Sequence, residues 1–311
     1  MSEENIVKSN KRQPWLAITL TFIMPGLGHL YCGTFVRAVV FTFICALPGM
    51  FIQVAVRSDP ASLMMSLLMP VIALYYILWL VVLLDSYRTA KKTRADYVLK
   101  DYNRWYVYLL LVLANMGGSL EEALSIRENY IEAFYVPAWS MFPTIENGDR
   151  FIASKIAYKD KDPQRGDIVV FKNPDDRRMN YIKRVVAVAA DTVEMIDGEL
   201  IVNGEKLKRT PVTTSGFDSE RGRLDGEIFA EQNGGARYLI FLMDEDRRDT
   251  NAVSDFGPVT VEDNHCFVLG DNRHGSKDSR HFGPIPLATI KGRAKFLYFP
   301  ARNWSRFGKI E

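Results

Sequence analysis

Long apolar runs crowd the first 120 residues of the chain, and no other feature limits its fold as strongly. Residues 15–31, 38–56 and 62–84 each approach the roughly 20 apolar residues that a helix needs to cross a bilayer. A fourth run, 105–120, is shorter and contains a pair of glycines, so it is a thin span or an interfacial helix, and we favour a span. Residues 1–125 are therefore predicted to form a membrane domain with three or four hydrophobic segments.

The basic residues between these runs predict how the membrane domain is oriented. They are densest in the loop 85–104, which by the positive-inside rule is cytoplasmic, so a fourth span would carry everything after residue 121 to the extracytoplasmic side. The basic residues of segment 8–12 also favour the cytoplasm, although three full spans before that loop would put the N-terminus outside. A re-entrant first segment, broken at Pro25 and Gly26, would remove the conflict. The exact number of spans stays open.

A polar residue, His29, lies inside the first apolar run, within the sequence PGLGHLYCG. A polar side chain in a membrane segment is a hint of function, but the surrounding glycines equally predict close helix packing. The segment also resembles small two-helix membrane modules that carry a glycine-rich Tyr-x-Gly hairpin. That resemblance implies no known activity.

Composition excludes several kinds of partner. The 39 Lys and Arg residues nearly balance the 37 Asp and Glu residues, so no overall charge favours a nucleic-acid surface. The three cysteines, Cys32, Cys45 and Cys266, are too few and too scattered for a disulfide framework, and they form no CxxC pair for zinc. We therefore expect no nucleic acid, no metal and no cofactor.

Residues 126–311 have the pattern of a mainly antiparallel β domain. Short runs rich in β-branched residues are separated by Gly, Asn, Asp and Pro, as in a sandwich or barrel. These runs are 167–171, 180–188, 191–196, 199–204, 237–242 and 265–270. The sequence NPDD at 173–176 predicts a turn, so the runs on either side of it should form a hairpin. Residues 207–235 are predicted to be long loops, within a loop insertion of about 205–262.

A single hydroxyl, Ser140, lies in the apolar sequence VPAWSMFPT, which we expect to be extended. Serine becomes a nucleophile when a nearby base accepts its proton, and the usual bases are histidine or a neutral lysine. His274 and His281 leave a Ser-His arrangement open. Lys183 is the better candidate, because it lies in the apolar sequence NYIKRVVAV, where desolvation would lower its pKa and strand alternation turns Arg184 away. A solvated strand lysine is the competing interpretation.

A second polar cluster, LGDNRHGSKDSRHFGPIP at 269–286, follows the run HCFV. Its Gly, Asn and Asp content predicts a turn, but a turn alone does not need two serines, two aspartates and two arginines. We expect Ser276 to hydrogen-bond a neutral lysine amine. Asp278 and Arg280 are expected to form a supporting ion pair.

Four stretches, taken together and in this order, resemble the type I signal peptidases, which are membrane-bound Ser/Lys proteases. They are PAWSMFPT (137–144), RGDIVVFK (165–172), YIKRVVAV (181–188) and GDNRHGSKDSR (270–280). The resemblance covers about residues 126–299. It implies transmembrane helices followed by a signal-peptidase-like β fold, in an enzyme of the cytoplasmic membrane that cleaves signal peptides from exported preproteins on the extracytoplasmic side. Signal peptides and membrane lipid would be its partners.

The resemblance also assigns roles to individual residues. The catalytic pair would be Ser140, the nucleophile, and Lys183, the general base. Supporting roles would belong to Ser276, which orients the lysine, and to the pair Asp278 and Arg280. Shallow pockets for small residues one and three positions before the cut would be lined by Phe134, Val136, Trp139 and Ile182.

Two positions depart from the family's pattern. Ala138 stands where the family has a serine whose hydroxyl helps to hold the oxyanion, and such a donor is worth ~3 kcal/mol in other enzymes. Trp139 replaces the usual glycine, and its indole either crowds the substrate pocket or turns into the β core or toward lipid. Two further hypotheses therefore stay open: a weak or inactive relative that binds peptides, and a Ser/Lys protease with one dedicated substrate.

Overall fold

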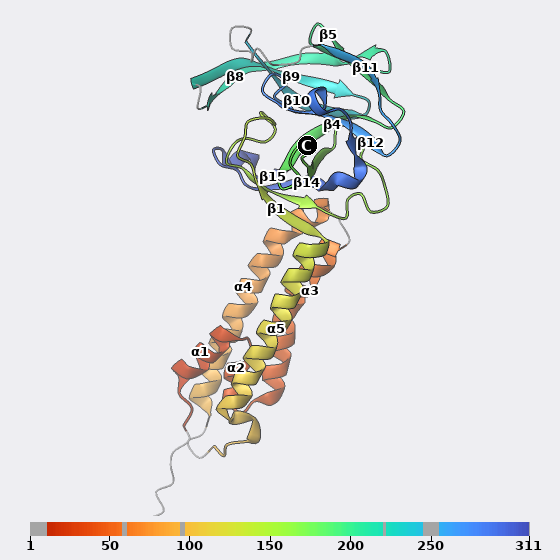
Figure 1. The fold of residues 1–311 in the computed structure, drawn as a ribbon. Coiled ribbons are helices and arrows are strands. Elements are labelled where there is room, and N and C mark those ends of the chain that lie inside the picture. The colour runs from red at the N-terminus through yellow and green to blue at the C-terminus, as the bar shows by residue number, and fades with distance from the viewer. Residues whose placement is uncertain (1–10, 58–60, 94–96, 220–221, 245–254, 311) are drawn as a thin grey trace, which may run out of the picture. The chain divides into compact units, whose positions relative to one another are not determined.

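The computed structural model describes residues 11–57, 61–93, 97–219, 222–244 and 255–310. The chain divides into two compact units, Met1–Arg127 and Glu128–Glu311 (Figure 1). The first unit is built from helices and the second from antiparallel strands.

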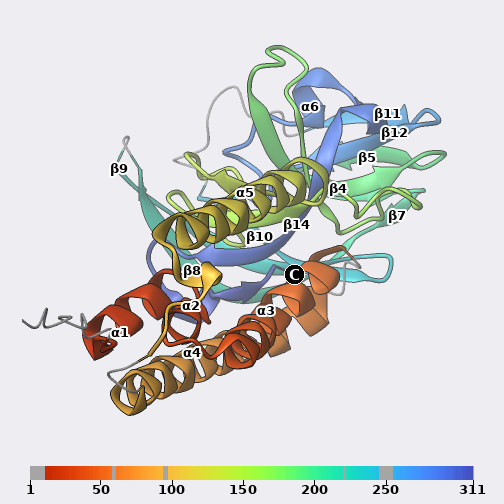
Figure 2. The ribbon, with the colours of Figure 1, turned by 90° about the horizontal axis from the view of Figure 1, so that it is seen from below.

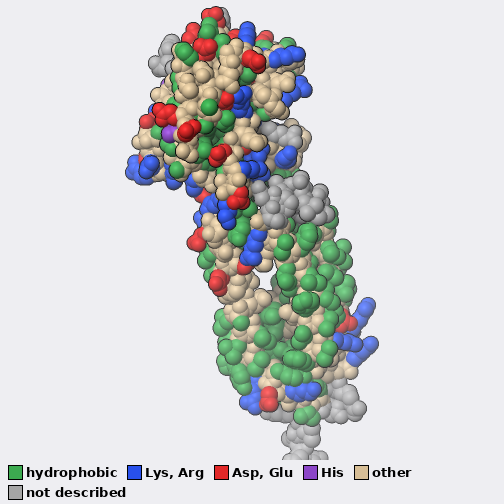
Figure 3. Space-filling model, turned by 90° about the vertical axis from the view of Figure 1, so that its right-hand side faces the viewer, with side chains coloured by type: hydrophobic (Ala, Val, Ile, Leu, Met, Phe, Trp, Pro, Cys, Tyr) green, Lys and Arg blue, Asp and Glu red, His purple; other side chains and the backbone are tan. Residues whose placement is uncertain are grey.

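The first unit contains three helical segments that are long and apolar enough to cross a membrane. Its helices are α1 (Pro14–Ile23), α2 (Leu27–Tyr31), α3 (Phe35–Arg57), α4 (Ala61–Lys92), η1 (Asp101–Asn103) and α5 (Trp105–Asn129). The candidate spans are α3, the part of α4 from Pro70 to Lys92, and α5, which runs unbroken through both glycines of the fourth predicted run. Hydrophobic side chains cover much of the helical surface (Figure 3), as expected of helices that face lipid.

The first predicted run is two short helices, α1 and α2, interrupted at Pro25 and Gly26. Proline has no N–H to continue the helical ladder. Gly26 adopts a φ of +91°, and a Cβ there would lie 2.4 Å from the carbonyl oxygen of Ala38. Helices of 10 and 5 residues are too short to span a bilayer. The expectation of a full span over 15–31 is therefore wrong, and the break at Pro25 and Gly26 is present.

His29 is buried in α2 and has a charged neighbour on α4. Its Nε2 lies 2.9 Å from Oδ2 of Asp85, and Nη1 of Arg37 lies 3.6 Å from the same oxygen. Asn103 donates from Nδ2 to the carbonyl oxygen of Leu30 at 2.8 Å. These contacts tie the short helix α2 to α4 and η1, so the polar residue has a packing role in this unit.

The second unit contains three antiparallel sheets. The largest has the order β1-β2-β14-β3-β4-β12-β13, with β15 paired to β14. Its strands are β1 (Ile131–Tyr135), β2 (Arg150–Ser154), β3 (Ile168–Lys172), β4 (Asn180–Val188), β12 (His265–Leu269), β13 (Ile285–Pro286), β14 (Ile290–Phe299) and β15 (Gly308–Lys309). The second sheet, in the order β11-β5-β6-β7, consists of β11 (Phe256–Thr260), β5 (Thr192–Ile196), β6 (Glu199–Val202) and β7 (Glu205–Lys206). The third, in the order β10-β9-β8, consists of β10 (Ala236–Met243), β9 (Gly222–Asn233) and β8 (Lys208–Ser219).

The predicted fold class, helices followed by a mainly antiparallel β domain, is confirmed. The hairpin predicted at the NPDD turn is also present, because β3 and β4 pair antiparallel with Val169 opposite Lys183. Figure 2 shows the unit from below, with β4 and β14 near its middle. Short helices, α6 (Ser279–Phe282), η3 (Leu287–Thr289) and η4 (Trp304–Arg306), complete it.

Most of residues 207–235, which were predicted as loops, lie in the strands β8 and β9. Buried Phe217, Ile228 and Ala230 are interleaved with small and polar residues, and the threonines suit the pleated surface of a sheet. The loop prediction is wrong because a turn-like composition hides this alternation. Elsewhere in the predicted insertion, β7, β10 and β11 are strands, and residues 245–254 lie outside the described residues.

Apolar packing anchors the segment that follows β1. Val136, Met141 and Ile145 are buried in one cluster with residues of β2, β3 and β14. A separate cluster, which includes Val169 and Val185, packs between β3, β4 and β12. The largest sheet thus holds both the segment around Ser140 and the strand that carries Lys183.

Candidate active site

Ser140 lies in a turn between β1 and β2. Backbone hydrogen bonds run from the N–H of Phe142 to the carbonyl oxygen of Trp139 (3.0 Å) and from the N–H of Ile145 to that of Met141 (2.9 Å). The expectation of an extended segment at Ser140 is therefore wrong, because these bonds close the backbone into a turn.

Lys183 is buried in the middle of β4, and its amine reaches the nucleophile candidate. Nζ lies 2.9 Å from Oγ of Ser140 and 2.8 Å from the carbonyl oxygen of Ile182. Burial is the main cause that lowers the pKa of Lys183 to about 8; the carboxylates of Asp278 and Asp271 act against it. An amine that is partly neutral near neutral pH can accept the proton of a serine hydroxyl at this distance.

Asp278 and Arg280 form the ion pair that the sequence predicts. Nε of Arg280 donates to Oδ1 of Asp278 at 2.8 Å, and both side chains are buried. Asp278 also accepts a hydrogen bond from the N–H of Gly270 at 2.9 Å. Burial alone would raise the pKa of Asp278, but Arg280 and these hydrogen bonds hold it below its ordinary value. The pair therefore stays charged, and the hydrogen bond from Gly270 to Asp278 fixes the two ends of the loop 270–280 to each other.

Ser276 is buried, but it does not make the hydrogen bond to Lys183 that the sequence predicts. Its Oγ has no partner of good geometry among the described residues. The side chain instead packs against Gly270, where a Cβ would lie 2.2 Å from Oγ of Ser276 and 2.5 Å from the carbonyl oxygen of Ser140. A glycine is needed at 270 to let Ser276 approach the nucleophile turn.

A buried ion pair that sequence reasoning missed holds the turn from the other side. Arg184 and Asp271 are both buried, with Nη2 and Oδ2 2.7 Å apart. Thr144 donates from Oγ1 to Oδ2 of Asp271 at 2.6 Å, and Asn272 donates from its N–H to the carbonyl oxygen of Ser140 at 3.2 Å. The available signal was an arginine beside the lysine on an otherwise apolar strand.

The two histidines of the alternative arrangement do not approach Ser140. Nδ1 of His274 accepts a hydrogen bond from the N–H of Met243 at 3.1 Å, and His281 is exposed. No hydrogen bond between either histidine and Ser140 is present among the described residues. The geometry favours lysine over histidine as the base.

The residues predicted to line the substrate pockets lie in two different surroundings. Phe134 and Ile182 are half-buried against the cluster that contains Val136. Trp139 belongs to another cluster, where its ring stacks on that of Phe217 with the centroids 4.2 Å apart. The indole was expected in the substrate pocket, in the β core or toward lipid, and its ring packing matches the β core.

Donors for an oxyanion are few around the turn. The N–H of Ser140 makes no hydrogen bond among the described residues, so it is free to donate to a substrate oxygen. Ala138 is exposed and offers no side-chain donor. The donor set of the site therefore contains the backbone N–H but lacks a hydroxyl at 138.

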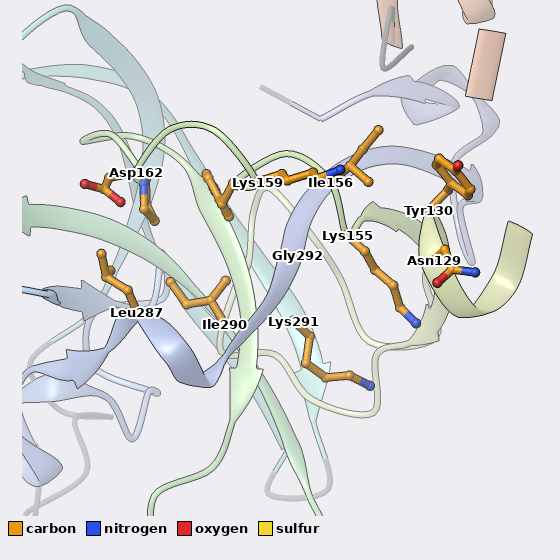
Figure 4. A pocket seen from close by; sticks show the side chains of 12 residues that line it. Asn129, Tyr130, Lys155, Ile156, Lys159, Asp162, Leu287, Ile290, Lys291 and Gly292 are labelled. Atoms are coloured by element: carbon orange, nitrogen blue, oxygen red, sulfur yellow. The ribbon is translucent and has the colours of Figure 1, made fainter. Parts of the chain in front are cut away.

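A hollow of 520 Å³ lies elsewhere in the second unit (Figure 4). It is lined by Asn129 and Tyr130 between α5 and β1, by residues of the segment 155–163, and by Leu287 and the start of β14; Ser140 and Lys183 are not among them. Two of its lysines, Lys155 and Lys291, contact Glu132 at 3.4 and 2.7 Å. Among the residues that the structure describes, no group of three His, Cys, Asp or Glu could hold a metal ion.

Comparisons with known proteins point to one family. A family model described as "Signal peptidase, peptidase S26" matches residues 102–299. The Synechocystis protein named "Probable signal peptidase I-1" is 31% identical over 195 residues, which cover 60% of this chain and 81% of that protein. Signal peptidase I of Pseudomonas aeruginosa is 30% identical over 258 residues, covering 71% of this chain and 82% of that protein. A solved signal peptidase I from Enterococcus faecalis is 27% identical and covers 43% of this chain and 97% of that chain, with a TM-score of 0.26, too low to support an argument about the fold.

Proposed function

Because the chain belongs to the signal peptidase family, peptidase S26, we propose that it removes signal peptides from exported preproteins with Ser140 as nucleophile and Lys183 as general base. The chain is a serine protease of the signal peptidase I type. The main observation that supports the Ser/Lys dyad is the distance of 2.9 Å between Oγ of Ser140 and the buried Nζ of Lys183. No cofactor takes part in this chemistry.

In the first half of the reaction, the neutral amine of Lys183 takes the hydroxyl proton while Oγ of Ser140 bonds to the scissile carbonyl carbon. The carbonyl oxygen becomes an oxyanion, toward which the N–H of Ser140 donates. Collapse of this intermediate breaks the peptide C–N bond, and the ammonium of Lys183 gives its proton to the departing amine. The signal peptide is left as an ester on Ser140.

In the second half, water replaces the amine as the reacting group. Lys183, neutral again, takes a proton from the water while the water oxygen bonds to the ester carbon. Collapse of this second intermediate breaks the bond between that carbon and Oγ of Ser140, the ammonium of Lys183 returns its proton to Oγ, and the signal peptide leaves with a free carboxylate. Both halves need the amine without its proton. The burial that lowers the pKa of Lys183 to about 8 is what supplies this form near neutral pH.

The supporting residues act on the shape of the loop 270–280. Asp278 and Arg280 are paired at its end, and Arg280 also donates from Nη2 to the carbonyl oxygen of Ser276 at 3.4 Å. We assign to Ser276 the orientation of the Lys183 amine in the reacting complex, where catalytic hydrogen bonds often tighten relative to the free enzyme. Its buried, unpartnered Oγ supports that assignment.

We also propose that Phe134, Val136 and Ile182 line shallow pockets for the small residues one and three positions before the cut. Phe134 and Val136 lead into the nucleophile turn, and Ile182 is the neighbour of Lys183 on β4. Their half-buried or buried apolar side chains suit alanine better than a charged residue.

The family is associated with membranes, and we propose that this chain crosses the cytoplasmic membrane three times, with α3, α4 and α5. The basic segment 85–104, which consists of the last residues of α4 and the connection to α5, is then on the cytoplasmic side, and α5 leads out to the β unit. Because α1 and α2 are too short to span, the N-terminal segment falls on the cytoplasmic side, where its basic residues 8–12 are favoured. Membrane lipid is thus a direct partner.

The test is cleavage of a small panel of preproteins by the full chain in detergent, with Ser140→Ala as the inactive control. A shorter product whose new N-terminus follows an Ala-x-Ala site is expected. Stoichiometric binding without product would reject the proposal and favour a peptide-binding relative, for which the missing hydroxyl at Ala138 is the motivating observation. Cleavage of one panel member alone would identify a protease with a dedicated substrate.

A further inference from the structure

Trp139, the residue before the nucleophile candidate, is packed into an aromatic cluster of the third sheet. Its ring is stacked on that of Phe217 in β8, with centroids 4.2 Å apart and planes 19° apart. The guanidinium carbon of Arg302 lies 4.7 Å from the indole centroid, and Phe142 and Phe241 belong to the same cluster. The side chain next to Ser140 therefore takes part in the packing of a sheet that carries no candidate catalytic residue.

The same sheet also holds the start of the loop 270–280. In β10, the N–H of Phe241 donates to the carbonyl oxygen of Asp271 at 2.8 Å, and its carbonyl oxygen accepts from the N–H of Arg273 at 3.0 Å. In β9, the buried carboxylate of Glu231 accepts hydrogen bonds from Arg273 and from Arg209 of β8, each at 2.9 Å. Every strand of this sheet thus contributes to holding the loop or the turn.

Asn272 joins the loop to the nucleophile turn through two hydrogen bonds, in addition to the bond from Thr144 to Asp271. Asn272 donates from its N–H to the carbonyl oxygen of Ser140 at 3.2 Å and from Nδ2 to that of Trp139 at 3.3 Å. The turn itself lies outside the strands. Its position is therefore set by these bonds and by what its side chains pack against.

We propose that Trp139 is a positioning residue for Ser140: its stack on Phe217 fixes the nucleophile turn to the β8–β9 hairpin, so catalysis depends on a sheet without catalytic side chains. The inference rests on the proposed function, because it concerns the placement of the proposed nucleophile. It also gives a role to an indole at a position where the family usually has glycine.

The rate of the reaction should be sensitive to this placement. Oγ of Ser140 must stay within hydrogen-bond reach of Nζ of Lys183, and the present distance is 2.9 Å. A misplacement of about 1 Å is enough to slow an enzyme by about 10²-fold. Loss of the stack should therefore lower kcat. Substrate binding, which depends on the other residues of the site, should stay unchanged.

The pH dependence provides a second signature. Lys183 is faced by the carboxylates of Asp271 and Asp278, by the guanidinium of Arg280 and, on its own strand, by the ring of Tyr181. Loss of the indole changes none of these groups. A shift to higher pH of the acid limb, which the pKa of Lys183 sets, would therefore report water reaching the amine.

The experiment compares Trp139→Ala, Trp139→Phe and Phe217→Ala in the full chain, in detergent, on a preprotein with alanine one and three positions before the cut. Phe256→Ala is the matched control, because Phe256 stacks on Phe267 at 5.2 Å in another part of the unit. Measurements are kcat, KM, the pH profile of kcat/KM and Tm for every variant.

We expect Trp139→Ala and Phe217→Ala each to lower kcat by about 10²-fold, to leave KM within about twofold, and to move the acid limb, which the pKa of Lys183 sets, to higher pH. Trp139→Phe should retain most of the wild-type kcat. The double variant Trp139→Ala/Phe217→Ala should be hardly slower than Trp139→Ala, because both changes remove one contact. Phe256→Ala should lower Tm and keep the pH profile.

Two results would overturn the inference. One is a loss of Tm in both Trp139→Ala and Phe217→Ala with kcat and the pH profile unchanged, which is a purely structural role. The other is a changed ratio of kcat/KM for substrates with Ala and Val before the cut, at an unchanged pH profile, which would place Trp139 in the substrate pocket.

An inactive wild-type chain would reject the proposed function, and the positioning role can then be tested without cleavage. In Ser140→Cys, the pH dependence of alkylation of the introduced thiol reports its contact with Lys183. Adding Trp139→Ala should shift this profile if the indole positions the turn. Identical profiles with and without Trp139→Ala would overturn the inference.

Discussion

Lys183 and Ser140 lie side by side, but the chain holds the two residues in different ways. Lys183 is in the middle of β4, which pairs with β3 on one side and β12 on the other, so backbone ladders set its position. Ser140 lies in a turn whose position depends on side chains from distant segments. Thr144 donates to Asp271 at 2.6 Å, and Arg306 donates to the carbonyl oxygen of Thr144 at 3.0 Å.

This difference has a consequence for substitutions. A strand keeps its register when one side chain changes, because its ladder is made of backbone hydrogen bonds. A turn that is held by side chains shifts when one of them is lost. Changes on β4 should therefore act on the chemistry, whereas changes around the turn should act on stability and geometry together.

On the strand side, Lys183→Arg should abolish cleavage and leave the fold intact. A guanidinium stays protonated and cannot accept the proton of Ser140, so we expect a loss of at least about 10⁴-fold in kcat. Single-turnover cleavage of a preprotein measures it, with Ser140→Ala as an equally inactive reference. Near wild-type turnover in Lys183→Arg, together with a loss of turnover in His274→Ala, would identify a histidine instead of Lys183 as the general base.

On the turn side, Asp271→Asn should destabilise the second unit by about 3–5 kcal/mol, because it leaves the buried charge of Arg184 uncompensated. Denaturant unfolding measures the loss. Asp175→Asn is the matched control, since it removes an exposed ion pair with Lys277, and exposed pairs contribute about 0–1 kcal/mol. Equal effects of the two substitutions would show that the buried pair does not hold the turn.

Lys183→Met should be inactive and more stable than the wild type by about 2 kcal/mol at pH 7. Burial lowers the pKa of Lys183 from its ordinary 10.5 to about 8, so the folded protein carries a desolvated ammonium below pH 8. Between pH 8 and 10.5 the unfolded chain binds more protons than the folded one, and wild-type stability rises with pH. The gap between the two proteins should therefore narrow over that window. A constant difference in the free energy of unfolding between the two proteins, measured in urea from pH 7 to 10, would show that the desolvated ammonium is not its cause.

The activity of the wild type should fall about tenfold for each pH unit below the pKa of Lys183, which is about 8. The reason is that only the neutral amine accepts the serine proton. The measurement is kcat/KM from pH 5 to 10 on a preprotein. A fall in kcat/KM that begins only near pH 6 would indicate a histidine or a carboxylate as the base.

The smallest effect is expected at Ser276. Because its Oγ has no hydrogen-bond partner of good geometry among the described residues, Ser276→Ala should lower kcat only three- to tenfold, the equivalent of about 1 kcal/mol. Tm should stay near the wild-type value, since Asp278 keeps its hydrogen bonds from Arg280 and from the N–H of Gly270. A loss as large as that of Lys183→Arg would show that the hydroxyl contacts the reacting groups directly.

The elements that the sequence predicted best are those with a regular apolar pattern. The run 180–188 is strand β4, residue for residue, and the NPDD turn joins the hairpin that contains it. The helical run 105–120 is part of α5. By contrast, the strands β8 and β9 were missed because their polar and small residues resemble a loop, and Phe217 is the one buried residue among the described residues of β8.

The candidate site was predicted in its members more than in its contacts. Ser140 and Lys183 are within hydrogen-bond distance, and their roles stay predictions. The bond from Ser276 to Lys183 is absent from the described contacts. Arg184 and Asp271 form a buried pair; the arginine on an apolar strand was a signal, but no local pattern indicates its partner. Contacts between side chains 87 residues apart depend on the packing of whole sheets.

By itself, the sequence determined where the long apolar helices and the most regular strands run, that the N-terminal part is apolar enough for a membrane, and which boxes resemble a signal peptidase. Those properties follow from periodicity and composition, which act over a few neighbouring residues. Only the tertiary structure decided that the first run is two short helices, that Ser140 sits in a turn, and that Trp139 stacks on Phe217. Each of these depends on a side chain or carbonyl from a distant segment, and burial against such partners sets the final geometry.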